Sequence, residues 1–215
     1  YVVKPSLSNG VCDYYIISRW DAVFRNSSRI DFTMWNRYTY LYDSFDPTGS
    51  ETGDPLPANS EYYYTNYDFS FDSDDSKDFT YKINPSFGKF YNGNKLSFDL
   101  ELSQKIRPKF TSSIEIKYDK VDLPEPYSSA KIFLIAPRFD FTFSKNLYWA
   151  TLVQYSNQND NLSLNTRLQW RFAPLSDLFL VYNDNYYTEN RYDSIFIPRV
   201  KNRSINLKLT YWLDI

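Results

Sequence analysis

The sequence predicts an all-β fold, and more specifically an antiparallel transmembrane outer-membrane β-barrel with about eleven strands visible in this chain. Two observations carry the prediction: an unusually aromatic composition and an apolar–polar alternation with a period of two residues. Twenty-one Tyr, seventeen Phe and five Trp stand among 215 residues, beside only five Gly and one Met. Aromatic residues favour strands, so an all-α fold is excluded. No run approaches the roughly eighteen apolar residues of a spanning helix, so a helical membrane protein is excluded as well.

The alternation predicts strands along most of the chain. Its clearest example is 161–172, where Leu164, Leu168 and Trp170 share one face and Asn165 and Arg167 share the other. Half-exposed strands have this pattern, with one apolar and one polar side. In order, the predicted strands are 12–24, 29–42, 61–72, 78–90, 95–105, 110–119, 129–143, 147–156, 161–172, 177–183 and 200–213.

The length of these strands favours a membrane over a soluble sandwich. A strand of about twelve residues, rising about 3.3 Å per residue and tilted by about 45°, covers the roughly 25 Å apolar band of an outer-membrane barrel. Sandwich strands are usually shorter and carry more Gly, Ala and Val. We therefore expect the apolar face to meet lipid and the polar face to line a lumen.

The connections between the predicted strands alternate between tight turns and freer links. Tight turns are expected at 25–28, 73–77, 105–109, 144–146 and 173–176, and the long links 43–60, 119–128 and 183–199 all fall in the other set. Outer-membrane barrels have short periplasmic turns and longer extracellular loops. The links 91–94 and 157–160 are expected outside as well, although both are short. The pattern thus predicts an orientation together with a fold.

Tyrosines crowd the strand ends nearest the expected outer loops. They are Tyr38, Tyr40, Tyr42, Tyr62, Tyr63, Tyr64, Tyr118, Tyr155, Tyr182, Tyr186 and Tyr187. Tyr prefers a membrane interface because its ring lies in the apolar layer while its hydroxyl reaches water. We interpret the set as an aromatic girdle, with ordinary strand propensity as the alternative.

The end of the sequence predicts that residues 1–215 are the C-terminal portion of a larger barrel. Segment 209–215 alternates like the C-terminal recognition signal of bacterial barrels, although it ends in Ile215 where that signal usually has Phe or Trp. Complete bacterial barrels have an even number of strands with both ends inside, whereas eleven strands place the ends on opposite sides. A miscounted strand is the alternative.

Composition excludes several kinds of chemistry. The sequence has no His, which rules out imidazole catalysis and imidazole metal ligands. Its 24 basic and 26 acidic residues give a formal charge of −2, which is unsuited to nucleic acid. The single cysteine, Cys12, is expected to be a packing residue. The acidic loop 46–54 lacks EF-hand spacing, so we prefer a solvated loop to a calcium site and expect no metal and no cofactor.

Four ordered motifs carry a family resemblance. They are GKFYNG at 88–93, LVQYSN at 152–157, NLSLNTRLQWRF at 161–172 and DLFLVYN at 177–183. These motifs resemble a group of Bacteroidota outer-membrane proteins in which a domain similar to carbohydrate-binding module family 9 precedes a large C-terminal barrel. The resemblance covers residues 60–215 and is strongest over 147–183. It implies that the carbohydrate-binding-like N-terminal domain is absent from this chain, and it assigns no catalytic residue.

Charged residues at inward positions form the candidate lumen lining. They are Asp99, Glu101, Glu115, Lys117, Arg138, Arg167 and Arg171. Asp99 and Glu101 share a face, and Glu115 with Lys117 should lie across the neighbouring strand, so a glycosidase-like carboxylate pair is conceivable. We prefer a salt-bridged lining, because inward polar positions are the rule in such barrels.

Three classes of function remain: a pore or transport barrel linked to carbohydrate handling, a structural or scaffold subunit of a larger outer-membrane complex, and a surface enzyme with a carboxylate site. The absent His and the dispersed carboxylates disfavour the enzyme, so we predict a non-enzymatic barrel in the bacterial outer membrane. Its expected partners are outer-membrane lipid, the barrel-assembly machinery during insertion, and other outer-membrane proteins or glycans, but not nucleic acid. Candidate surface-loop contacts are Tyr186, Tyr187 and Tyr192.

Overall fold

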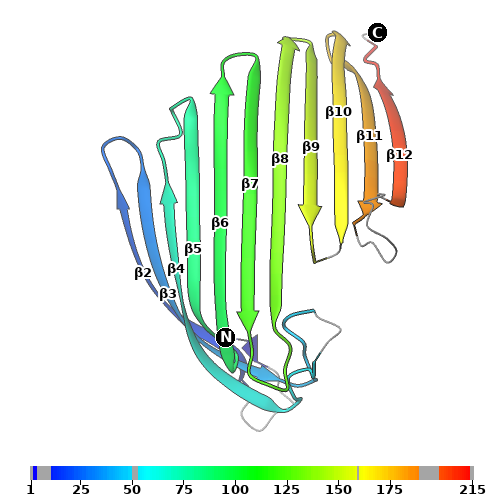
Figure 1. Cartoon of the computed structure of the whole chain (residues 1–215). Helices are drawn as coiled ribbons and strands as arrows, with labels where there is room; N and C mark the ends of the chain where they lie inside the picture. The colour runs from blue at the N-terminus through cyan, green and yellow to red at the C-terminus, as the bar shows by residue number, and fades with distance from the viewer. Residues whose placement is uncertain (1, 4–10, 50–52, 159, 189–198, 214–215) are drawn as a thin grey trace. The chain divides into compact units, whose positions relative to one another are not determined.

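The computed structural model describes residues 2–3, 11–49, 53–158, 160–188 and 199–213. These residues form an all-β structure in which antiparallel strands pair in sequence order from β1 to β12 in one sheet (Figure 1). No helix in the described ranges is long and apolar enough to span a membrane. The prediction of an all-β antiparallel fold is therefore confirmed.

The strand bounds agree closely with the predicted ranges. The strands are β1 (Val2–Val3), β2 (Val11–Val23), β3 (Arg29–Leu41), β4 (Ser60–Asp72), β5 (Phe79–Phe90), β6 (Gly93–Ile106), β7 (Phe110–Asp122), β8 (Ala130–Ser144), β9 (Leu147–Ser156), β10 (Asn161–Ala173), β11 (Ser176–Tyr187) and β12 (Arg199–Thr210). The short strand β1 was not predicted. The other eleven strands each contain 10 to 15 residues.

The largest differences from prediction, of three or four residues, occur at the ends of β7, β11 and β12. β11 continues to Tyr187 instead of ending at 183, because Tyr187 still pairs with Asn161 and Arg199. The Asn and Asp residues in 183–185 had suggested a loop, but pairing on both sides overrides that local preference. β12 ends at Thr210 instead of 213, because Thr210 pairs with Asp177 near the start of β11. The pairing partners, which the local sequence does not show, decide where β11 and β12 end.

Shorter and longer links alternate along the chain as predicted, except at residues 91–92 between β5 and β6, which form one of the shortest links. β8 and β9 are joined by residues 145–146 alone, and β10 and β11 by 174–175, whereas β3 and β4 are joined by 42–59. In the tight link after β2, Phe24 and Ser28 are joined by a backbone hydrogen bond of 2.9 Å. Tight links leave little choice of register between the strands they connect.

The chain divides into two compact units. The first contains residues 1–75, 82–99 and 117–132, and the second contains 76–81, 100–116 and 133–215. In each unit, alternation along the strands gives an apolar face and a polar face.

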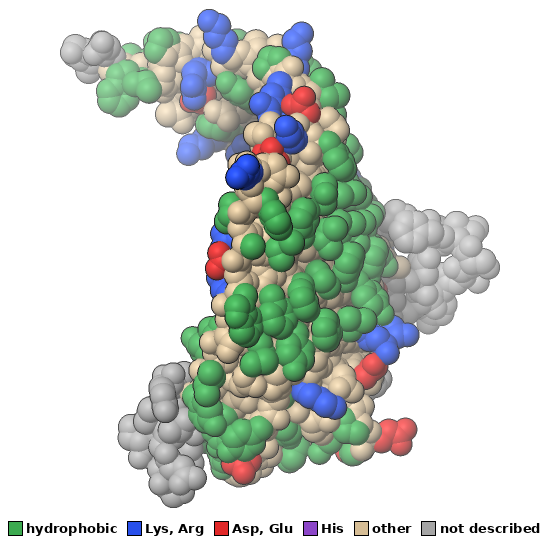
Figure 2. Space-filling view, turned by 90° about the vertical axis from the view of Figure 1, so that its left-hand side faces the viewer, with side chains coloured by type: hydrophobic (Ala, Val, Ile, Leu, Met, Phe, Trp, Pro, Cys, Tyr) green, Lys and Arg blue, Asp and Glu red, His purple; other side chains and the backbone are tan. Residues whose placement is uncertain are grey.

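Aromatic rings cover the apolar face of the first unit. Trp20, Phe32, Phe69 and Phe87 come from β2, β3, β4 and β5, with centroid separations of 5.4, 4.6 and 6.0 Å along the series. Aromatic pairs at such distances add to the energy gained from cross-strand packing. Hydrophobic side chains form a continuous area on the face shown in Figure 2, and the charged side chains in that view gather toward its two ends.

The polar face of the first unit carries paired charges. Arg19 and Arg29 both bind Asp31, at 2.5 and 2.8 Å, and Asp31 is only 8% exposed. A carboxylate this buried needs such partners, since an unpaired buried charge is costly.

The apolar face of the second unit follows a row of residues across four strands. The register aligns Trp149, Leu168, Leu180 and Leu207 on β9, β10, β11 and β12. These side chains are 36% to 68% exposed. Every strand of the described residues belongs to the same sheet, so no second layer among them covers this row. The strand order ends at β1 and at β12, so the sheet is not closed within the described residues.

Candidate functional site

Four of the predicted lining residues occupy alternate positions on β6 and β7, which are neighbours in the sheet. Glu101 is exposed, and Asp99, Glu115 and Lys117 are half-buried. Each of the four takes part in a polar or electrostatic interaction, so none is an isolated charge. Asp99 and Lys117 belong to the first unit described above, and Glu101 and Glu115 belong to the second.

The three predicted arginines lie in the second unit and differ in their partners. Arg138 donates two hydrogen bonds to Asp140, at 2.8 and 3.0 Å, and Arg171 contacts Asp177 at 3.3 Å. Arg167 has neither a hydrogen bond nor an ion pair with any described residue. Arg167, Arg171 and Asp140 line one cavity of about 330 Å³. The structure therefore brings two of the predicted arginines together with a carboxylate.

A row of amide and hydroxyl groups, missed by the sequence analysis, crosses the polar face of the second unit. Asn165 Nδ2 donates to Asn183 Oδ1, and Asn183 Nδ2 donates to Ser204 Oγ at 3.2 Å. Asn185 Nδ2 donates to Asn202 Oδ1 in the same way. The repetition of Asn and Ser at polar positions of these strands was the signal in the sequence that could have predicted this row. Such groups bind water and polar solutes without carrying charge.

Two tyrosines predicted as surface-loop contacts are strand residues instead. Tyr186 and Tyr187 end β11, because both of its neighbours keep pairing to that point. The third, Tyr192, lies outside the described residues. The hydroxyls of Tyr182 and Tyr186 each donate to Asp184 Oδ2 at 2.6 Å. Tyr182 and Tyr186, near this strand end, therefore belong to a local polar cluster around Asp184.

Asp184 is a buried carboxylate on the otherwise apolar face of the second unit. It pairs in register with Leu164, is 1% exposed, and lies 2.7 Å from Arg203 Nη2. Its Oδ1 atom has no hydrogen-bond partner among the described residues. Loss of Arg203 would leave an uncompensated buried charge, which is strongly destabilising.

A cluster of buried hydrophobic residues in the first unit joins its links to the ends of its strands. Leu56 is 0% exposed, and it packs with Val121 and Leu123 at the end of β7. Leu41, Tyr62, Phe90, Tyr91 and Tyr127 surround these three residues. We call this group of eight residues the loop core. These contacts give Leu56 a defined position, which a residue of a solvated loop would lack.

Polar contacts fix the same loop. Asp46 Oδ1 accepts hydrogen bonds from the amide and the hydroxyl of Thr48, at 2.8 and 2.6 Å, and the Thr48 and Ser128 hydroxyls lie 2.7 Å apart. Gly53 has a φ of 95°, and a Cβ there would lie 2.7 Å from the Ser128 amide nitrogen. The acidic loop 46–54, considered as a calcium site, thus uses its first carboxylate for turn capping, and no metal-binding group of His, Cys, Asp or Glu occurs among the described residues.

Burial in the loop core changes the acidity of one phenol. Tyr91, in the link between β5 and β6, packs against Tyr62 and Tyr64 with centroid separations of 5.3 and 5.5 Å. Burial, helped by the neighbouring Tyr64, raises the pKa of Tyr91 to about 12. The hydroxyl is therefore neutral at physiological pH.

The loop core lies on the polar side of the first unit. Arg37 pairs in register with Tyr64 on the polar face, and Leu41 and Tyr62 follow at alternate positions of the same two strands. Alternate residues of a strand share a face. Leu56, in the long link, therefore packs on the polar face at the end of β3 and β4.

A cavity of about 250 Å³ adjoins the loop core on this face. Its polar-face lining consists of Arg37, Tyr64, Asn66, Asp68, Ser86, Phe90 and Lys95. Tyr64 and Phe90 also contact Tyr91, at 5.5 and 4.9 Å between ring centroids, which connects the cavity to the loop core. We call it the Arg37 cavity. The sequence analysis singled out Tyr64 as a girdle residue and missed the cavity.

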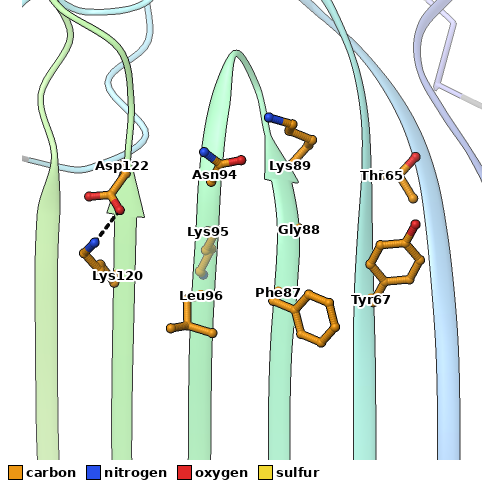
Figure 3. Close-up of a pocket in the computed structure, with 10 residues that line it drawn as sticks. All are labelled: Thr65, Tyr67, Phe87, Gly88, Lys89, Asn94, Lys95, Leu96, Lys120 and Asp122. Carbon is orange, nitrogen blue, oxygen red and sulfur yellow. Dashed lines mark hydrogen bonds and ion pairs between the residues drawn. The ribbon is translucent and has the colours of Figure 1, made fainter.

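The opposite face of the same strands carries a shallower pocket of about 520 Å³, drawn in Figure 3. Tyr67, Phe87 and Leu96 form its apolar part, and Lys120 binds Asp122 at 2.5 Å nearer the strand ends. Apolar rings toward the middle of a strand with charged groups at its end are typical of a surface that crosses from lipid to water.

Comparison of the chain with protein-family models, with curated proteins and with solved structures found no match. The family resemblance of the four motifs therefore stays a prediction, and function has to be argued from the geometry.

Proposed function

We propose that this chain is part of an outer-membrane β-barrel, with its apolar face toward lipid and its polar face toward a water-filled lumen. The observation that carries the proposal is the uncovered apolar row of Trp149, Leu168, Leu180 and Leu207. A soluble sheet buries such a face against a second layer. Contiguous exposed apolar surface marks a membrane or protein contact.

The polar face supports a pore or transport function for this barrel. It carries ion-paired charges such as Arg138 with Asp140, and the neutral amide row that includes Asn165 and Asn183. Both suit an aqueous lining. Leu56 and the described residues beside it in the long link, packed on the polar face, would narrow the passage at its outer end. We propose a non-enzymatic pore for polar solutes, in agreement with the link to carbohydrate handling that the resemblance implies.

A scaffold subunit of a larger outer-membrane complex is the second candidate. Asp184 and Arg203 favour it, because their ion pair lies on the apolar face and the Arg203 side chain is 51% exposed there. A protein neighbour could accept further hydrogen bonds from the Arg203 guanidinium, whereas lipid tails could not.

Bilayer conductance and cysteine accessibility test the proposal together. We expect the full-length protein to give discrete conductance steps in a planar bilayer, and expect none from a scaffold. On whole cells carrying Cys12→Ser, a membrane-impermeant maleimide should react at Ala58→Cys in the long link and not at Lys145→Cys in the tight turn. Both positions are exposed, and native Cys12 is buried, so accessibility reports orientation. Labelling at position 145 alone would mean that the orientation is opposite to the one proposed. Absence of conductance would refute the pore.

A further inference from the structure

The Arg37 cavity has a cation that no described residue neutralises. Arg37 makes neither a hydrogen bond nor an ion pair with any described residue. Its guanidinium lies 4.5 Å from the ring centroid of Trp35, which holds the side chain in place without satisfying its five donors. A half-buried guanidinium held in this way is ready to bind a carboxylate or phosphate.

A second cation faces the same space. Lys95 lies 5.7 Å from the ring centroid of Phe90 and 3.4 Å from Asp119, a loose ion pair that leaves ammonium donors available. The carboxylate of the cavity wall, Asp68, keeps its negative charge, but three neutral donors hold its oxygens and it forms no ion pair with Arg37 or Lys95.

The donors to Asp68 come from its neighbours on three strands. Trp35 Nε1 and Ser86 Oγ each donate at 2.6 Å, and Asn66 Nδ2 donates at 3.3 Å. Hydrogen bonds of this kind spread the charge of a carboxylate and fix its direction. The cavity therefore presents two cations with spare donors beside an anion whose acceptors are largely used.

Aromatic surfaces complete the cavity. The rings of Tyr64 and Phe90 lie 6.1 Å apart, nearly perpendicular to each other at 80°. Such rings pack against the apolar C–H faces of a sugar ring as they do against other apolar surfaces. The volume of about 250 Å³ is below the roughly 300–1,000 Å³ of drug-sized sites, so it suits a single ring with its substituents.

We propose that the Arg37 cavity binds the uronate residue of an acidic saccharide on its way through the lumen. The carboxylate would bind Arg37 and Lys95, the sugar ring would pack on Tyr64 and Phe90, and hydroxyls would bind Asn66. The inference deepens the proposed function and rests on it, since a saccharide reaches this cavity only if the polar face lines an aqueous space.

Equilibrium binding of oligogalacturonate to the detergent-solubilised full-length protein tests the site. We expect binding of oligogalacturonate, but not of its methyl ester, which keeps the ring and loses the charge. Arg37→Gln should weaken binding about tenfold or more, and Arg37→Lys should weaken it less, because charge is kept while the paired hydrogen bonds are lost. Arg167→Gln is the matched control, since Arg167 is also unpaired on a polar face but lies outside the cavity.

Heat-modifiable migration in electrophoresis confirms that each variant has folded. If Arg37→Gln does not fold, Lys95→Gln replaces it, with the same expected loss of binding. Equal affinity for oligogalacturonate and its methyl ester, or equal losses in Arg37→Gln and Arg167→Gln, would overturn the inference. Conductance without any saccharide binding would refute this site and leave the pore intact, whereas a lack of both would refute the proposed function.

Discussion

Two residues that are adjacent in a strand of this chain lie in different environments. Leu168 belongs to the exposed apolar row of the second unit, while Gln169, one residue later, donates to Asp177 on the polar face at 3.2 Å. The difference follows from the two-residue period of a strand. It allows the proposed lipid face to be tested with two neighbouring substitutions.

Leu168→Arg should destabilise the folded protein in a membrane far more than Gln169→Arg. A charge facing lipid near the midplane costs about 2–4 kcal/mol, whereas a charge facing a lumen is tolerated. The measurement is the folded fraction in lipid vesicles as a function of urea concentration. Equal folding yields for the two variants would mean that the apolar face does not meet lipid.

Tyr91 should give the loop core an alkaline pH dependence. The pKa of Tyr91 is about 12 in the folded protein, against about 10 for an unfolded chain, so the folded state keeps this proton while the unfolded state loses it. The stabilisation is complete below about pH 10 and is lost as the pH rises toward about 12. The measurement is a tyrosine absorbance titration of the wild type, from which the titration of Tyr91→Phe is subtracted. The difference curve should have its midpoint near pH 12. A midpoint near pH 10 would mean that the Tyr91 phenol is exposed to water.

At the scale of elements, the links carry as much of the packing as the strands do. The fully buried leucine of the first unit, Leu56, lies in a link, and it contacts Val121 and Leu123 from the far end of β7. Gly93 permits this approach, since a Cβ there would collide with the Asp122 carbonyl oxygen and with Leu123. A link held in this way behaves as part of the fold.

Leu56→Ala should release the loop of residues 42–59 while the strands stay paired. Truncation of a fully buried leucine leaves a cavity and costs about 2–5 kcal/mol. We expect faster proteolysis within 42–59, larger conductance steps and unchanged heat-modifiable migration. Leu175→Ala is the control, because Leu175 is 66% exposed in a tight link and should change none of these. Unchanged proteolysis in Leu56→Ala would mean that the loop core does not hold the loop.

For the whole molecule, the decisive feature is the open sheet. The strand order ends at β1 and β12, each of which has one neighbour within the described residues. Unpaired backbone groups exposed to lipid cost several kcal/mol each, so a membrane sheet has to close on itself.

Residues 1–215 expressed alone should therefore fail to form a monomeric, heat-modifiable barrel. The exposed edges should pair with other copies instead, giving aggregates by light scattering, whereas a longer chain that supplies closing strands should fold in detergent. A monodisperse, protease-resistant monomer made from these residues alone would contradict this, and would mean that the two edges pair with each other in a membrane.

The sequence by itself determined eleven of the described strands, their order along the chain and the alternation of polar and apolar residues on their faces. The alternation over 161–172 predicted β10 to within one residue, because a period of two is a local property of backbone geometry. The same periodicity predicted Arg138, Arg167 and Arg171 as lumen lining, a role that stays a prediction, and it did not show their partners.

Only the tertiary structure decided the features that join distant segments. Leu56 meets Val121 across sixty-five positions of sequence, and the Arg37 cavity gathers side chains from β3, β4, β5 and β6. These contacts depend on strand register and on the packing of the links. Neither leaves a short-period pattern in the sequence from which it could be predicted. The length of β11 had the same cause, since pairing on both sides kept Tyr186 and Tyr187 in a strand where the local residues favoured a loop.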